Sequence, residues 1–130
     1  MTTAVVFAYS EVGVRCLRVL LRRGVQVALV LTHEDDPNED RWFGRVAEVA
    51  AQHGIPVAAP HDPNVERWIE AISRLRPDFL FSFYYRHLLC DRLLHSAKYG
   101  ALNMHGSLLP KYRGRAPVNW AILHGEIETG

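Results

Sequence analysis

The stretch from residue 4 to residue 31, AVVFAYSEVGVRCLRVLLRRGVQVALVL, decides the fold. Its first six residues form a continuous apolar run rich in β-branched and aromatic side chains, which is typical of a strand buried on both faces. Residues 11–23 then show helical periodicity, and Gly24 is placed to end that helix. One face of the predicted helix carries Val12, Cys16, Val19 and Leu20. A second apolar run over residues 25–31 completes a β–α–β unit.

The alternation of strand and helix continues to the end of the chain. Further strands are predicted over residues 56–59, 78–83 and 100–104. Further helices are predicted over residues 41–53, 64–75 and from Ala116 onward, with Asp40 before the first and Pro117 in the first turn of the last. This pattern predicts an α/β fold, a doubly wound parallel sheet in the order 3-2-1-4-5 with helices on both faces. Residues 1–130 contain no repeat or linker, so we expect one domain, truncated at its C-terminal end because residues 127–130 do not resemble a tail.

The composition is that of an ordinary globular domain. The 130 residues include 15 Lys and Arg against 14 Asp and Glu, which excludes a generally cationic protein held on nucleic acid by bulk electrostatics. Cys16 and Cys90 are too few for a disulfide framework and are predicted to be buried free thiols, which suits a reducing cytoplasm. The seven histidines show no metal-ligand spacing, so no metal site is predicted. Because there is no signal peptide and no apolar run of ~20 residues, we expect a cytoplasmic protein without membrane insertion.

Two common ligand fingerprints are missing. Only Gly13 follows the first predicted strand, where a dinucleotide-binding fold requires Gly-x-Gly-x-x-Gly, and no Walker pattern occurs anywhere in the chain. The sequence therefore argues against a nicotinamide- or flavin-dependent oxidoreductase and against a P-loop NTPase.

Polar and aromatic residues follow the fourth and fifth predicted strands. Tyr84, Tyr85 and Arg86 could line a pocket for a flat ligand, or they could be core aromatics next to a surface arginine. Asn103 and His105 lie two residues apart and therefore point to the same side of an extended segment. An amide that donates to a developing oxyanion and an imidazole that carries a proton together suit attack on a carbonyl. The alternative is a capped strand end with a satisfied histidine.

Three cations then stand within five residues, beside the start of the last predicted helix: Lys111, Arg113 and Arg115. Such a loop can bind a phosphate or a carboxylate, although a solvated basic turn has the same composition. The acidic segment of residues 34–40 lacks the glycine and the terminal glutamate of a calcium loop, so it is interpreted as a solvated loop.

The segment Asn103-x-His105-x-Ser107-Leu108-Leu109-Pro110, followed by Arg113-Gly114, closely resembles the signature of the folate-dependent formyltransferases. The likeness extends over the whole chain. It implies a Rossmann-like N-terminal catalytic domain that binds 10-formyltetrahydrofolate as the formyl donor. It also implies that Asn103 and His105 are catalytic, together with an aspartate that follows later in the family. By the same resemblance, the donor contacts His87, Leu88, Leu89 and Arg115.

Within this family, residues 5–9, 81–88 and 111–117 look most like the branch that formylates UDP-4-amino-4-deoxy-L-arabinose, found in the bifunctional polymyxin-resistance proteins of lipid A modification. The resemblance implies a UDP-linked amino sugar as acceptor and no nucleic acid partner. One alternative is a methionyl-tRNA formyltransferase, which carries a basic insertion after the second strand. Here residues 32–40 hold five acids and no Lys or Arg, and Tyr112 stands where the tRNA enzymes typically have Trp.

A second alternative is a non-catalytic fragment that binds folate or a nucleotide. No Asp follows His105 in the sequence, although the family's catalytic set includes one. We therefore expect residues 1–130 alone to be inactive, because removing a member of a catalytic triad usually lowers the rate by several powers of ten.

Overall fold

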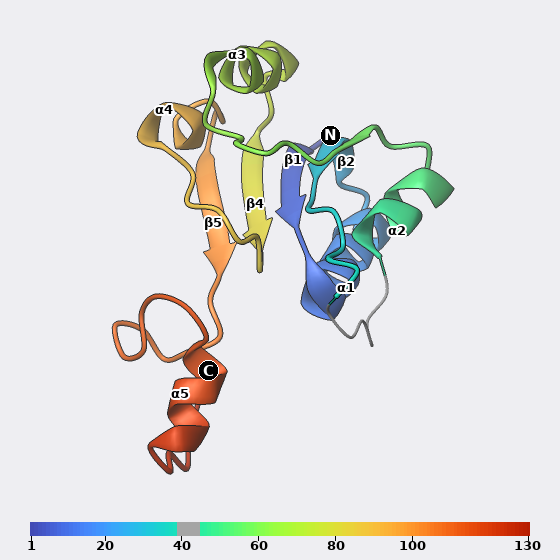
Figure 1. Cartoon of the computed structure of the whole chain (residues 1–130). Coiled ribbons are helices and arrows are strands. Elements are labelled where there is room, and N and C mark those ends of the chain that lie inside the picture. The colour runs from blue at the N-terminus through green and yellow to red at the C-terminus, as the bar shows by residue number, and fades with distance from the viewer. Residues whose placement is uncertain (39–44) are drawn as a thin grey trace.

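The computed structural model describes residues 1–38 and 45–130 (Figure 1). Its strands are β1 (Thr3–Ala8), β2 (Gln26–Leu31), β3 (Val57–Ala58), β4 (Phe79–Phe83) and β5 (Gly100–Met104). Its helices are α1 (Ser10–Arg22), α2 (Val46–Gln52), α3 (Glu66–Leu75), α4 (Asp91–Leu94) and α5 (Pro117–Leu123). The predicted α/β alternation is confirmed, and the strand predicted over residues 100–104 has the same bounds as β5.

The strands form a parallel sheet in the predicted order β3-β2-β1-β4-β5. The central strand β1 pairs with β2 on one side and with β4 on the other. The arrowheads of β1, β4 and β5 point the same way in Figure 1. Residues that follow different strands therefore meet at one edge, where doubly wound sheets bind their ligands.

The two faces of β1 belong to two separate hydrophobic cores, because successive side chains of a strand point to opposite sides. Ala4, Val6 and Ala8 pack with apolar residues of α1 and α2. Val5 and Phe7 pack with residues of α3 and α4. All five side chains are fully buried. Burial of a large apolar side chain is worth about 1.5–3 kcal/mol, so the sheet holds the ends of its strands firmly in place.

The buried face of α1 agrees only in part with the predicted one: Cys16 and Leu20 pack against the core as predicted, partly buried. The structure buries Gly13, Val14 and Leu17, whereas Val19 is 48% exposed. The reason is the close approach of the helix to β1: a Cβ atom at Gly13 would lie 3.1 Å from the Cβ atom of Ala8. The glycine lets this side of the helix face the strand, and a helix that is apolar around much of its circumference does not reveal that choice by periodicity alone.

Other predictions are corrected at the level of single elements. The described part of the second helix begins at Val46, and Arg45 before it is extended rather than helical. Asp40 and residues 41–44, predicted as the start of that helix, lie outside the described residues. The helix α4 is not predicted from the sequence, because four residues are too few to show a helical period. Cys16 and Cys90 are free thiols as predicted, but they are only partly buried.

The last strand and the last helix are the most open part of the fold. Leu102 and Met104 of β5 are 56% and 47% exposed. The helix α5 begins at Pro117, as predicted, and lies apart from the sheet beyond the arrowhead of β5 (Figure 1). Neither this helix nor another in the described ranges combines the length and the apolar character needed to cross a bilayer.

Candidate active site

Backbone strain is concentrated at the C-terminal edge of the sheet. The described chain has five non-glycine residues with positive φ, and four of them follow β1, β4 or β5: Ser10, Tyr84, Tyr112 and Ala116. A non-glycine residue in such a conformation costs on the order of 1–3 kcal/mol, and such residues cluster at binding and catalytic sites. This edge also holds the residues that the sequence predicts to be catalytic.

Asn103 is the second-last residue of β5 and lies opposite Ser82 of β4 in the sheet register. The residue is exposed. Within residues 1–38 and 45–130, no group forms a hydrogen bond with its side-chain amide. The amide is therefore available to donate to an oxygen atom of a bound substrate.

His105 follows β5 directly, and both of its ring nitrogens have partners. Its Nε2 lies 3.0 Å from the carbonyl oxygen of Gly114, and its Nδ1 lies 2.9 Å from Oγ of the buried Ser107. A carbonyl oxygen only accepts, so Nε2 carries the proton and Nδ1 accepts from the Ser107 hydroxyl. The structure therefore agrees with the alternative interpretation, in which both ring nitrogens of the histidine at the strand end have hydrogen-bond partners. To exchange a proton with a substrate, the ring must release one partner, and the Gly114 carbonyl belongs to the exposed loop.

Three of the four residues predicted to contact the folate, His87, Leu88 and Leu89, lie in a segment after β4, residues 86–89, whereas Arg115 lies in the loop after β5. His87 and Leu88 are exposed, and the Leu88 side chain is 93% accessible. Leu89 differs, because it packs against the core beside α3 and α4. The far end of the 86–89 segment is held by Asn64, whose Nδ2 donates to the Leu88 carbonyl (2.8 Å) and whose Oδ1 accepts from the Cys90 N–H (2.7 Å). No role of Asn64 is predicted from the sequence.

The near end of the 86–89 segment is held by His33, which follows β2. The backbone N–H of Arg86 donates to His33 Nε2 at 2.9 Å. The imidazole stacks on the ring of Tyr85, with centroids 4.2 Å apart, and meets the rings of Tyr9 and His87 edge-on. Burial, together with the nearby His87 and Arg86, lowers the pKa of His33 from 6.5 to about 4. His33 is therefore neutral at pH 7, with Nε2 as acceptor, and its proton is on Nδ1.

Among the aromatic residues after β4, Tyr85 agrees with the core interpretation, and the pocket that these residues could line stays a prediction. Tyr85 is partly buried against Phe7 of the core, and its hydroxyl is buried without a partner in the described part of the chain. Burial and the charge of Asp62 raise the pKa of Tyr85 to about 12. Tyr84 is 38% exposed, and the Arg86 guanidinium lies 4.7 Å from the centre of the Tyr9 ring. Tyr85 is therefore an aromatic residue of the core at the end of β4.

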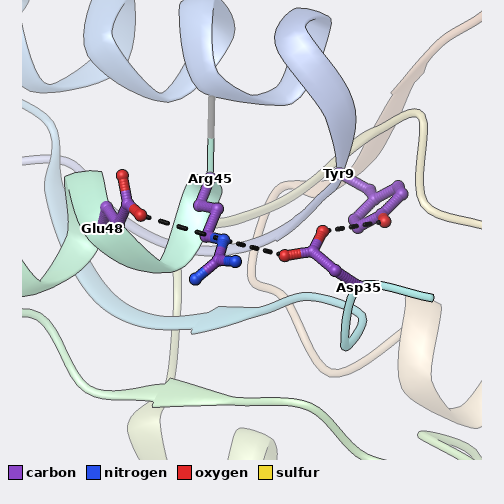
Figure 2. Close-up of polar contacts among 4 residues, drawn as sticks. All are labelled: Tyr9, Asp35, Arg45 and Glu48. Carbon is purple, nitrogen blue, oxygen red and sulfur yellow. Dashed lines mark hydrogen bonds and ion pairs between the residues drawn. The ribbon is translucent and has the colours of Figure 1, made fainter. Parts of the chain in front are cut away.

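Asp35 ties the loop after β2 to β1 and α2 (Figure 2). Its carboxylate accepts from the Tyr9 hydroxyl at 3.2 Å and pairs with Arg45 Nε at 2.9 Å, and Arg45 also reaches Glu48 at 3.8 Å. Tyr9, Asp35 and Arg45 border a small cavity of about 30 Å³, which is large enough for a water molecule. The prediction of a solvated loop for the acidic segment is wrong for Asp35, because its carboxylate is bonded to Tyr9 and Arg45.

The three cations of the loop after β5 are not equivalent. Lys111 Nζ lies 2.7 Å from Oε1 of Glu126, which also accepts from the Tyr112 hydroxyl at 2.7 Å. These bonds lower the pKa of the Glu126 carboxyl. Arg113 and Arg115 are exposed, and no ion pair to either occurs in the described residues. The two arginines are therefore the cations available to an anionic ligand.

The chemistry of this edge does not involve an evident metal site. Across residues 1–38 and 45–130, no group of three or more His, Cys, Asp or Glu side chains is arranged to hold a metal ion. The structure instead assembles an exposed amide, an imidazole, a held aromatic segment and two exposed arginines around the ends of β4 and β5. These are groups for binding an anionic organic substrate and for moving protons.

Solved structures of known enzymes resemble this chain. The phosphoribosylglycinamide formyltransferase of Bacillus halodurans is 27% identical with a TM-score of 0.71, over 95% of this chain and 66% of that one. Glycinamide ribonucleotide transformylase 1 of Geobacillus kaustophilus is 26% identical with a TM-score of 0.75, over 100% and 71%. A formyltetrahydrofolate deformylase of Pseudomonas syringae pv. tomato is 25% identical with a TM-score of 0.69, over 95% and 42%.

These matches extend over almost all of the present chain but not over all of the solved proteins. The chain spans about two thirds of the length of the first two. The model of the formyl transferase family matches residues 5–130, which include every described strand and helix except the first two residues of β1, and the whole edge described above. The chain belongs to the formyl transferase family.

Proposed function

We propose that the full-length protein transfers a formyl group from 10-formyltetrahydrofolate to the amine of UDP-linked 4-amino-4-deoxy-L-arabinose. The observation that carries the proposal is the exposed amide of Asn103, two residues before His105 at the end of β5, to which no described residue forms a hydrogen bond. Membership in the formyl transferase family supports the reaction type. The similarity to a formyltetrahydrofolate deformylase supports a folate as formyl donor.

The two polar residues at the end of β5 supply the chemistry of formyl transfer. When an amine attacks the formyl carbon, negative charge develops on the formyl oxygen. Asn103 donates a hydrogen bond to that oxygen, and one such donor typically contributes about 10²–10³ in rate. His105 moves a proton from the attacking amine toward the departing folate nitrogen, after its ring has released Gly114 or Ser107.

The 86–89 segment and Arg115 form the proposed donor site. His87 and Leu88 offer an aromatic and an apolar surface for the ring system of the folate. Leu89 fixes the segment to the core, and Arg115 is an exposed cation on the neighbouring loop. The residues fit the donor, which has a flat ring at one end and carboxylates at the other.

The acceptor is assigned from charge. A sugar nucleotide needs one or two cations for its diphosphate, and Arg113 is an exposed cation that can supply one, because Arg115 is assigned to the donor and Lys111 is paired with Glu126. Transfer RNA requires a broad basic surface. In the described part of the loop after β2, Glu34, Asp35 and Asp36 carry the opposite charge.

A second acceptor is supported by the comparisons. Two of the similar structures are glycinamide ribonucleotide formyltransferases, so a small phosphorylated amine is the competing substrate. The deformylase adds water as a third acceptor.

An acceptor competition tests the proposal. The full-length protein is incubated with 10-formyltetrahydrofolate and, in separate reactions, with the UDP-amino sugar, glycinamide ribonucleotide, methionyl-tRNA or no acceptor. We expect the highest kcat/KM for the UDP-amino sugar and only a shallow dependence on salt. A higher kcat/KM for another acceptor would transfer the assignment to that substrate, and formate release without an acceptor would indicate hydrolysis.

A further inference from the structure

One histidine joins three strands at the edge of the sheet. His33 follows β2, Tyr9 follows β1, and the Tyr85–Arg86 pair follows β4. Since β2 and β4 lie on opposite sides of β1, His33 spans the end of the central strand. Its ring contacts Tyr9 and Tyr85, and its Nε2 accepts from the backbone of Arg86.

The hydrogen bond from Arg86 lies at a point where the backbone changes direction. Tyr84, two residues earlier, has a φ of 59°, so the chain leaves β4 through a strained conformation that needs support from its surroundings. Asn64 supplies such support at the Leu88 end. His33 supplies it at the Arg86 end. The 86–89 segment is therefore held between two polar side chains from outside it.

We infer that His33 is a positioning residue for the formyl donor, which acts by holding the Arg86 end of the 86–89 segment through its Nε2 acceptor. This inference rests on the proposed function, because that function assigns the segment to the donor. His33 itself needs no contact with the donor. Its effect passes through the hydrogen bond from the Arg86 N–H.

The surroundings of His33 favour an acceptor at Nε2. Among the described residues, the titratable and charged groups near the ring are the Arg86 guanidinium, His87, Tyr85 and Tyr9, together with Asp35 and Arg45, which line the same small cavity. Positive charge from Arg86 disfavours a charged imidazole, and a charged imidazole has no acceptor. An uncharged residue with an acceptor at the same reach satisfies the same requirement.

Two substitutions separate the acceptor from the ring. His33→Phe keeps an aromatic ring for stacking on Tyr85 but removes the acceptor, whereas His33→Gln keeps an acceptor and removes the ring. His53→Phe is a matched control, because His53 lies at the end of α2 and, among the described residues, its Nδ1 has the Val49 carbonyl one turn earlier as its hydrogen-bond partner. Circular dichroism of each full-length variant verifies the fold.

The first measurement is hydrogen exchange at the Arg86 amide. We expect exchange at least about tenfold faster in His33→Phe than in wild type, because a backbone N–H left without a partner loses its protection. His33→Gln and His53→Phe keep wild-type exchange within about threefold. Unchanged exchange in His33→Phe would show that His33 does not hold the segment.

The second measurement is the dissociation constant of 10-formyl-5,8-dideazafolate, a stable analogue of the donor, together with the KM of the acceptor. In His33→Phe the dissociation constant rises about tenfold or more while the acceptor KM stays within about threefold. His33→Gln restores donor binding. Equal donor affinity in wild type and His33→Phe, or a tenfold loss in His33→Gln, would overturn the positioning role. If wild type itself does not bind the analogue, the proposed function fails, and this inference fails with it.

Discussion

The lowered pKa of His33 makes the stability of the fold depend on pH in a defined direction. The pKa of His33 is 6.5 in the unfolded chain and about 4 in the folded one. Between these values the unfolded state binds the proton and the folded state does not. The contribution of His33 is therefore complete above pH 6.5 and is lost as the pH falls toward 4. Because the ring is partly exposed, solvent screening reduces the full linkage, and we expect about 1 kcal/mol to be lost between pH 7 and pH 5.

The assay is urea unfolding of wild type and His33→Gln at pH 7 and at pH 5, followed by circular dichroism. The quantity of interest is the difference between the two proteins in the free energy that each loses on acidification, since the other titrating groups are common to both. Wild type should lose about 1 kcal/mol more than the variant. A difference below about 0.3 kcal/mol would refute the claim that His33 is kept neutral by the fold.

The site and the core give four further predictions. Asn103→Ala should lower kcat by about 10²–10³ with little change in stability, since the side chain is exposed, and steady-state kinetics with thermal unfolding checks this. His105→Ala should lower kcat by about a hundredfold or more and leave donor affinity near wild type. Arg115→Met should raise the KM for at least one of the two substrates more than Lys111→Met does, because the Lys111 charge is paired with Glu126, and equal effects would contradict this ranking. Phe7→Ala should lower the free energy of unfolding by about 3–5 kcal/mol in urea titrations, and a loss below 1 kcal/mol would contradict its place in the core.

The features predictable from sequence are those set by local pattern. The fully buried run of β1, the alternation of strands and helices, and the start of α5 at Pro117 each leave a periodic or capping signal in a short window. Right-handed crossover connections then restrict the sheet order, and the observed order agrees. Asn103 and His105 could be identified as candidates because polar residues at the end of a strand stand out against an apolar run.

The features that escaped prediction are those set by contacts between distant segments. Asn64 and Leu88 are 24 residues apart, and Arg86 and His33 are 53 apart, so no window of the sequence contains either pair. The pairing of Lys111 with Glu126 likewise depends on the fold of the loop between them. His33 had one signal in principle: it follows a buried strand, at the edge where parallel strands end. Periodicity does not indicate which neighbour such a residue will meet.

The most direct test of the proposed formyl-transfer site is a crystal structure of the full-length protein with 10-formyl-5,8-dideazafolate bound. We expect the folate ring to lie against the 86–89 segment and Asn103 Nδ2 to lie about 3 Å from the formyl oxygen. We also expect the His105 ring to have lost its hydrogen bond to Gly114 or to Ser107 and to face the formyl group. A donor bound elsewhere, or one whose formyl oxygen is out of reach of Asn103, would contradict the assignment of this edge as the site of formyl transfer.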